Sequence, residues 1–204
     1  MDVSKRADWS TGHRATGWMI ACASLVLVLA MPAEAHSQTR QGFWASGGLG
    51  MGFGAARCAV CRGSRDAGLA ASLGAGASLG QAFALGVDGN GWSSDEGTVG
   101  LSIGTVNALM LWYPSARTPW FFSFGSGVFL YRADDDDPDV PAITATSLGI
   151  RAGVGYDVSI ADKLAVTPYF NFIASVAADL EAAGESLTGA RLTLIQFGVG
   201  LTYR

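Results

Sequence analysis

Residues 145–158 read ATSLGIRAGVGYDV, and this stretch decides which kind of fold the chain adopts. Large apolar residues alternate with glycine or polar residues along it. The apolar set is Leu148, Ile150, Ala152, Val154 and Tyr156. A side-chain period of two is the signature of a β-strand with two different faces. The stretch is longer than a typical soluble strand of about 5–6 residues, and it is long enough for the roughly 9–11 residues that a tilted strand needs to cross a membrane.

Seven further segments show the same alternation. They cover residues 43–55, 67–79, 82–92, 98–113, 120–132 and 164–176, and the final stretch that ends at 204. The longer or more polar connections are 56–66, 93–97, 133–144 and 177–189. The shorter ones are 80–81, 114–119 and 159–163. This regular exchange of long and short connections is typical of barrels with long outer loops and short periplasmic turns.

Aromatic residues gather at the expected periplasmic strand ends, on the apolar side of each strand. They are Phe43, Phe83, Tyr113, Trp120, Tyr156 and Tyr203. Aromatic rings favour the headgroup level of a membrane. A lipocalin-like soluble barrel would instead place its bulky residues inside and charged residues outside. We therefore predict an all-β fold, an eight-stranded antiparallel up-and-down transmembrane β-barrel.

The overall composition agrees with a wall that faces lipid. Charged residues make up 15% of the chain, which is low beside the roughly 25% of a typical soluble domain. The net charge is −4, and lysine and arginine are scattered singly after residue 40. No basic stripe is present, so we expect no nucleic-acid partner.

The first 35 residues have the layout of a secretory signal peptide. Lys5, Arg6 and Arg14 precede an uncharged run over 18–31, and the sequence PAEA follows and ends at Ala35. A membrane-anchoring helix is the alternative, but the run is short of the roughly 20 residues that a span needs. We predict cleavage near Ala35, a short N-terminal segment over 36–42 and a barrel domain over 43–204. The predicted location is the bacterial outer membrane.

Three short stretches carry a resemblance to a known family. Residues 153–157 read GVGYD, residues 164–169 read LAVTPY, and the chain ends in FGVGLTYR over 197–204. In these stretches the chain resembles the superfamily of small outer-membrane β-barrels, which includes the outer membrane protein A, X and W types. The resemblance implies contact with the outer-membrane assembly machinery and with outer-membrane lipid, including lipopolysaccharide. The chain departs from the family at Arg204, because the final strand of these barrels commonly ends in an aromatic residue.

The same parity predicts which polar residues point into the barrel. They are Asp88, Arg151, Asp157, Tyr169, Asn171 and Gln196. They could line a pore or a ligand site, or they could form an internal hydrogen-bonded plug that satisfies buried charges. An eight-stranded barrel is just wide enough for side chains to fill, which favours the plug. Inward aromatic residues would suit a site for small apolar solutes: Trp44, Phe121, Phe129 and Tyr131.

Two expected outer loops carry further candidate sites. Cys58 and Cys61 form a C-x-x-C, for which we predict a local disulfide, because the βαβ context of a redox motif and the ligands of a zinc site are missing. The third loop holds an acidic run, Asp134, Asp135, Asp136, Asp137 and Asp139. It could bind Ca²⁺, or Mg²⁺ shared with lipopolysaccharide phosphates, although it lacks the EF-hand pattern. A solvated loop is the simpler interpretation.

Catalysis is not expected from this sequence. The only histidines are His13 and His36, both outside the predicted barrel, so a serine nucleophile there would lack its usual base. We expect no cofactor. The first functional hypothesis is a structural or surface-interaction barrel, and the second is a narrow channel or a binding barrel for small apolar or polar solutes.

Overall fold

The computed structural model describes residues 42–57, 65–96, 99–135, 137, 139–182 and 185–204. Most of these residues lie in strands. The strands are β1 (Gly42–Arg57), β2 (Asp66–Ser78), β3 (Phe83–Glu96), β4 (Val99–Trp112), β5 (Trp120–Asp135), β6 (Ile143–Tyr156), β7 (Val158–Ala161), β8 (Leu164–Ala182) and β9 (Glu185–Tyr203). No helix within the described ranges is long and apolar enough to cross a membrane.

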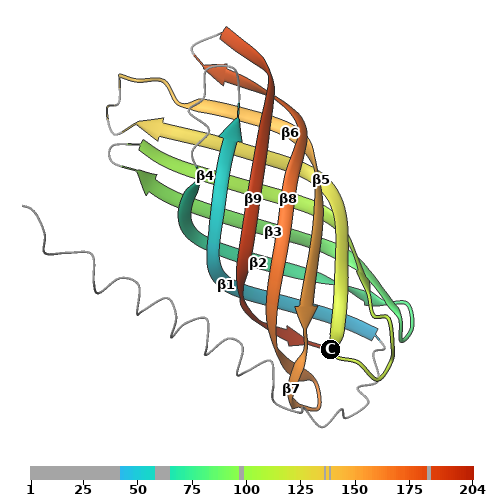
Figure 1. Ribbon diagram of the computed structural model, residues 1–204. Helices are drawn as coiled ribbons and strands as arrows, with labels where there is room; N and C mark the ends of the chain where they lie inside the picture. Colours follow the sequence, from blue (N-terminus) through green and yellow to red (C-terminus); the bar gives the residue numbers. More distant parts are fainter. Residues whose placement is uncertain (1–41, 58–64, 97–98, 136, 138, 183–184) are drawn as a thin grey trace, which may run out of the picture. The chain divides into compact units, whose positions relative to one another are not determined.

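The strands form one antiparallel sheet that closes on itself (Figure 1). Each strand from β1 to β6 pairs with the next one along the chain, while β9 pairs with both β1 and β8. Pairing of β6 with β8 completes the ring of long strands. The short strand β7 pairs with the first residues of β8. The predicted eight-stranded up-and-down barrel is therefore confirmed.

The two ends of the barrel differ in what they carry. The lower end in Figure 1 holds β7 and the C-terminal Arg204, together with the starts of β1 and β3. The upper end holds the last residues of β1, β3, β5 and β8. We use these two names below, and the lower end corresponds to the end expected to face the periplasm.

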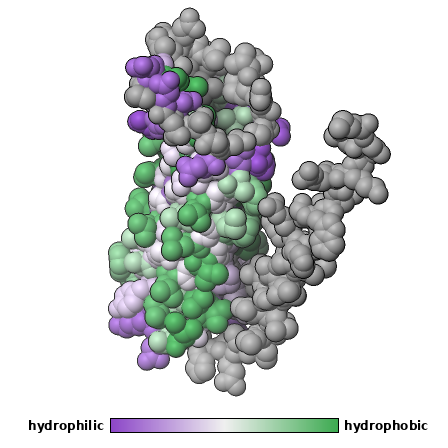
Figure 2. Space-filling model, turned by 90° about the vertical axis from the view of Figure 1, so that its left-hand side faces the viewer, coloured by the Kyte–Doolittle hydropathy of each residue, from purple (hydrophilic) through white to green (hydrophobic). Residues whose placement is uncertain are grey.

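A belt of apolar side chains covers the outside of the barrel. Members that are more than half exposed include Leu49, Leu69, Leu73, Val87, Val106, Leu148 and Ile150. Figure 2 shows one face, where hydrophobic side chains cover the middle and lower part of the wall and hydrophilic ones lie above them and at the lower edge. A monomeric soluble protein rarely exposes so large an apolar surface. The belt is what a barrel wall in contact with lipid requires.

Strand β4 faces the opposite way from our prediction. We expected Tyr113 on the outside, and with it Leu109 and Leu111, which share its parity, but all three are buried inside the barrel. The reason lies in the register of β4 on β3. Asn107 pairs directly with Asp88, and directly paired residues share one face of a sheet. Because Asp88 faces inward, every second residue from Asn107 does too, and Trp112 occupies the outer position beside Phe122 instead.

The remaining aromatic residues at the lower end agree better with the prediction. Phe43, Phe83, Trp120 and Tyr203 are exposed on the outside of the barrel. Tyr156 is partly exposed, and its ring packs edge-on against Trp120 with a centroid distance of 4.9 Å. The outward aromatic group at this end therefore exists, with Trp112 in place of Tyr113.

The connection that we predicted over 177–189 is largely strand. Strands β8 and β9 continue to Ala182 and from Glu185, and these two residues pair with each other. Two register shifts interrupt this ladder between Ala174 and Leu180. A bulge adds one residue to one strand, so the alternation changes phase there and no single parity runs through the segment. This change of phase made the upper part of β8 look like a loop.

Candidate functional site in the barrel interior

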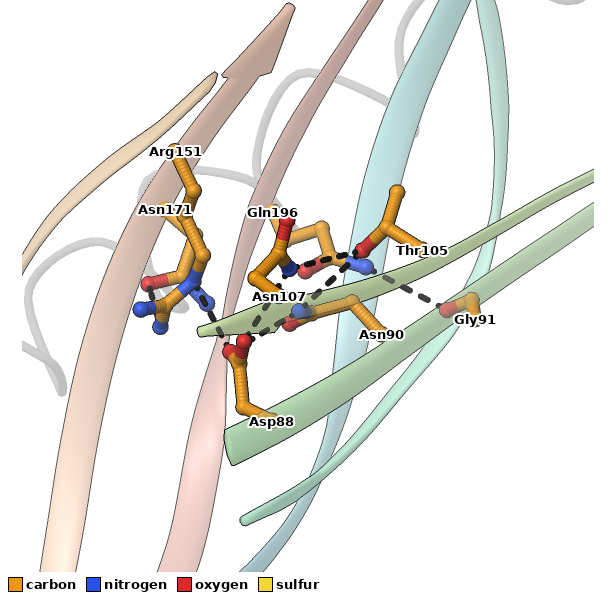
Figure 3. Close-up of polar contacts among 8 residues, drawn as sticks. All are labelled: Asp88, Asn90, Gly91, Thr105, Asn107, Arg151, Asn171 and Gln196. Carbon is orange, nitrogen blue, oxygen red and sulfur yellow. Dashed lines mark hydrogen bonds and ion pairs between the residues drawn. The ribbon is translucent and has the colours of Figure 1, made fainter. Parts of the chain in front are cut away.

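A layer of polar side chains crosses the interior of the barrel (Figure 3). Its members are Asp88 and Asn90 from β3, Thr105 and Asn107 from β4, Arg151 from β6, Asn171 from β8 and Gln196 from β9. They point inward because successive side chains of a strand alternate between its two faces, and the other face of each strand meets the outside. We call these residues the polar layer.

Asp88 lies at the centre of the polar layer. Its Oδ2 lies 3.1 Å from Nε of Arg151 and accepts a hydrogen bond of 2.9 Å from Nδ2 of Asn90. Its Oδ1 accepts a hydrogen bond of 3.0 Å from Nδ2 of Asn107. A buried carboxylate is stable only when its charge and its hydrogen-bonding capacity are both satisfied, and Asp88 meets both conditions.

Arg151 is less completely satisfied than its partner. Its Nη2 donates to Oδ1 of Asn171 at 2.8 Å. Its Nε is close to Asp88 but is not aligned for a hydrogen bond, and neither Nε nor Nη1 has a hydrogen-bond partner among the described residues. The guanidinium is nevertheless almost fully buried, with 8% of the side chain exposed. The polar layer therefore holds a buried cation, and two of its N–H-bearing nitrogens donate to no acceptor among the described residues.

A small cavity adjoins the free side of Arg151. Its volume is about 70 Å³, and its lining includes Arg151, Tyr169 and Arg204. The hydroxyl of Tyr169 also lacks a hydrogen-bond partner within the part of the chain that the structure describes. One water needs about 10–15 Å³ of cavity volume, so this cavity can hold several waters. Such waters would accept hydrogen bonds from Arg151 and Tyr169.

The structure brings together some of the interior residues that we predicted and separates others. Asp88, Arg151 and Asn171 form one connected group, while Gln196 donates to the backbone oxygen of Gly91 at 3.2 Å. Tyr169 lines the cavity, and Asp157 lies apart at the lower end.

Three members of the polar layer were missed by sequence reasoning. Thr105 and Asn107 lie on β4, whose two faces we had assigned in reverse. Asn90 shares the parity of Asp88, so the alternation of β3 already contained the signal for it. Its amide donates to Asp88 and, at 3.4 Å, to Thr105.

Apolar side chains fill the interior above and below the polar layer. The upper group contains Trp92, Ile103, Phe129, Ile173, Leu192 and Leu194, with Tyr131 packed against it. The lower group contains Trp44, Ala84, Leu109, Leu111, Tyr113 and Phe121. Phe129, Ile173, Leu192 and Leu194 are each 0% exposed, so solvent does not reach them from the upper end.

Glycines make room for the large rings of these groups. The ring of Trp92 lies against Gly52 and Gly54, and a Cβ atom on Gly54 would come within 2.6 Å of it. The indole Nε1 donates to the backbone oxygen of Gly52 at 3.0 Å. The ring of Tyr169 likewise lies against Gly48 and Gly198, and the ring of Phe121 lies against Gly155. Aromatic rings therefore lie over several of the inward glycines.

Arg204, which follows β9, joins buried polar side chains at the lower end. Arg204 forms an ion pair with Asp157, with 2.6 Å between Nη2 and Oδ2, and it also hydrogen-bonds the hydroxyl of Tyr113. Asp157 in turn accepts from Thr167 at 2.8 Å. Burial lowers the pKa of Arg204, but Asp157 and Tyr113 outweigh this effect, so the pKa lies above its usual value. Arg204 therefore remains a cation in this position.

Solved structures place this arrangement in a known fold. The chain matches the crystal structure of Neisserial surface protein A with a TM-score of 0.58 and 13% identity, over 79% of this chain and 96% of that one. The chain has the fold of the small outer-membrane β-barrels. It also matches Ail, the attachment invasion locus protein of Yersinia pestis, with a TM-score of 0.51 and 10% identity, over 80% of this chain and 99% of that one. No protein-family model and no curated protein matches the chain.

The acidic run at the upper end makes local contacts instead of converging on one point. Asp134 pairs with Arg132 at 2.6 Å. The carboxylates of Asp135 and Asp137 each accept from a backbone N–H two residues further on, that of Asp137 and that of Asp139. Within the described ranges no group of three acidic, histidine or cysteine side chains is arranged to hold a metal. Asp136, Cys58 and Cys61 lie outside the described residues.

Replacing Arg204 by glutamine is expected to destabilise the barrel by about 1.5–3 kcal/mol, because Asp157 would lose a charged hydrogen-bond partner while staying buried. Urea titration of the protein in lipid vesicles measures this loss. Lys163→Gln is the matched control, since it removes an exposed positive charge at the same end. Equal stability of Arg204→Gln and wild type would contradict a stabilising role for the ion pair.

Proposed function

We propose that the chain is an integral outer-membrane β-barrel with a sealed interior, and that its role is structural or consists of contacts made by its outer surface and upper end. The filled interior carries this proposal. Two buried apolar groups lie above and below the polar layer, and Arg204 pairs with Asp157 at the lower end. A barrel packed in this way offers a rigid wall to the membrane and leaves its rim and loops for contact with partners.

The outside of the barrel supports a membrane location. The exposed apolar belt suits lipid, and outward aromatic residues collect at the lower end. The expected export route begins with the signal peptide over 1–35, cleaved near Ala35, and continues with the outer-membrane assembly machinery. Outer-membrane lipid and lipopolysaccharide are then the natural partners of the wall.

A channel or a solute-binding barrel is the alternative function. The cavity of about 70 Å³ beside Arg151 is the feature that favours it. Passage through the barrel, however, would require the fully buried side chains of Phe129, Ile173 and Leu194 to move aside. Water between Arg151 and Tyr169 would satisfy their unpartnered groups and would account for the cavity without any transport function.

Conductance in a planar lipid bilayer tests the sealed barrel. We expect no discrete current steps from protein extracted from the outer membrane of an expressing Gram-negative host, because the interior is closed by packed side chains. Insertion is verified on the same sample by the different gel migration of unboiled and boiled protein. Reproducible steps that change on Arg151→Ala would contradict the proposal and would favour a pore lined by the polar layer.

A further inference from the structure

Two arginines face each other on the outside of the barrel near its upper end. Arg57 on β1 pairs directly with Arg191 on β9, and both residues are exposed. Both share the outward parity of their strands, with Phe53 and Ile195 four residues below them. Like charges placed directly opposite each other destabilise a sheet, because paired side chains lie only about 4.5–5.5 Å apart at Cβ. No ion pair found among the described residues offsets this repulsion.

A third arginine lies directly before the neighbouring strand β2. Arg65 directly precedes Asp66, which pairs with Gly54 of β1, and Arg65 is exposed. Strands β9 and β1 and the residue before the adjacent strand β2 (Figure 1) thus each place one arginine in the same part of the upper rim. We call Arg57, Arg65 and Arg191 the arginine cluster.

The cluster differs from the other outward arginine at this end. Arg132 on β5 is already neutralised by Asp134, which accepts two hydrogen bonds from it. The ion pairs found among the described residues involve Arg132, Arg151 and Arg204, and none involves the cluster. Three positive charges without a paired carboxylate in the described part of the chain favour an anionic ligand.

The position of the arginine cluster along the barrel axis indicates which anion it binds. Arg191 lies about 30 Å along the barrel axis from the outward Tyr203, at a rise of about 3.4 Å per residue and a strand tilt of about 40°. This distance is close to the thickness of a bilayer's hydrocarbon core, about 30 Å. If the ring of Tyr203 lies at the lower membrane interface, Arg191 therefore lies at the level of the upper headgroups. Arginine also binds phosphate through two parallel hydrogen bonds, which suits a phosphorylated headgroup.

We propose that the arginine cluster binds the phosphates of a bisphosphorylated glycolipid of the lipid A type in the outer leaflet. This inference rests on the proposed outer-membrane location and names the lipid that the wall contacts. The binding is electrostatic at an exposed site, so it weakens as salt is raised.

Lipid binding to the purified full-length gene product, followed by native mass spectrometry in detergent, tests the inference. The probes are bisphosphoryl lipid A, monophosphoryl lipid A and phosphatidylcholine. We expect the wild type to prefer bisphosphoryl lipid A, and the double variant Arg57→Gln/Arg191→Gln to bind it at least about tenfold more weakly, because charged hydrogen bonds to phosphate are lost. Arg132→Gln, whose charge is already paired, and Arg117→Gln in the lower turn should bind like the wild type.

Several outcomes would overturn the inference. Wild-type affinity in the double variant, or an equal loss in Arg132→Gln, would show that the cluster is not the site. Equal binding of inorganic phosphate in place of the lipid would indicate a general anion site. The gel shift on boiling is scored first on each sample. A wild type that fails to insert contradicts the proposed function and this inference together, whereas insertion without a lipid A preference contradicts this inference alone.

Discussion

Replacing Trp92 by alanine is expected to lower the free energy of unfolding by about 3–5 kcal/mol, the usual cost of removing a large buried ring. Trp92 is 4% exposed, and it lies within the upper apolar group. Gly52 and Gly54 carry no side chains that could fill the space left behind, so the cavity would persist. Urea titration in lipid vesicles, read as the fraction of protein that keeps its unboiled gel migration, measures the loss.

Trp112→Ala is the matched control for this experiment. Trp112 lies on the outside of the barrel, and 39% of it is exposed where Trp92 is buried. Lipid can occupy the space that its ring leaves, so we expect a smaller loss. Equal losses in the two variants would mean that the upper apolar group does not hold the barrel together as its burial indicates.

The second large effect is expected when Asp88 is replaced by alanine. This change leaves Arg151 as an unpaired charge in the interior, and the loss of one partner from a buried ion pair costs about 3–5 kcal/mol. Asn90 and Asn107 also lose their acceptor, which adds to the loss. Urea titration in vesicles applies here as well, and Asp95→Ala, an exposed position on the same strand, is the control.

A double variant separates the charge effect from simple loss of packing. Asp88→Leu/Arg151→Met replaces the ion pair by apolar side chains and should recover much of the stability, since no charge then stays buried without a partner. If the double variant is less stable than Asp88→Ala, the polar layer contributes more through its hydrogen bonds than through the pairing of its charges.

The exterior of the barrel could be predicted from the sequence alone because lipid contact imposes a simple rule. Every second residue must be apolar there, and Leu148, Ile150 and Val154 follow that rule along the second half of β6. Strand β4 shows where the rule ends. Leu109 and Leu111 are apolar but face the interior, so hydrophobicity alone could not tell its two faces apart. Only the pairing of Asn107 with Asp88 assigns them, and that pairing is a property of the assembled sheet.

The interior could be predicted only in part for a related reason. The polar residues of β3, β6, β8 and β9 stood out against apolar neighbours, so Asp88 and Arg151 were identified as inward. The ion pair between them joins strands that are not adjacent in the sheet, and strand periodicity carries no information about contacts across the lumen. The same applies to Arg204, whose partners Asp157 and Tyr113 come from other parts of the chain.

The fit between rings and glycines inside the barrel has an evolutionary consequence. Changing either Trp92 or Gly54 alone costs stability, because a larger residue at 54 meets the ring and a smaller one at 92 leaves a hole. In descendants of this protein, a ring and the glycine beneath it should therefore be substituted together. When one strand loses its ring, the facing strand should gain one. Two lineages could keep the same wall and the same closed interior while their aligned sequences disagree about which strand carries the tryptophan.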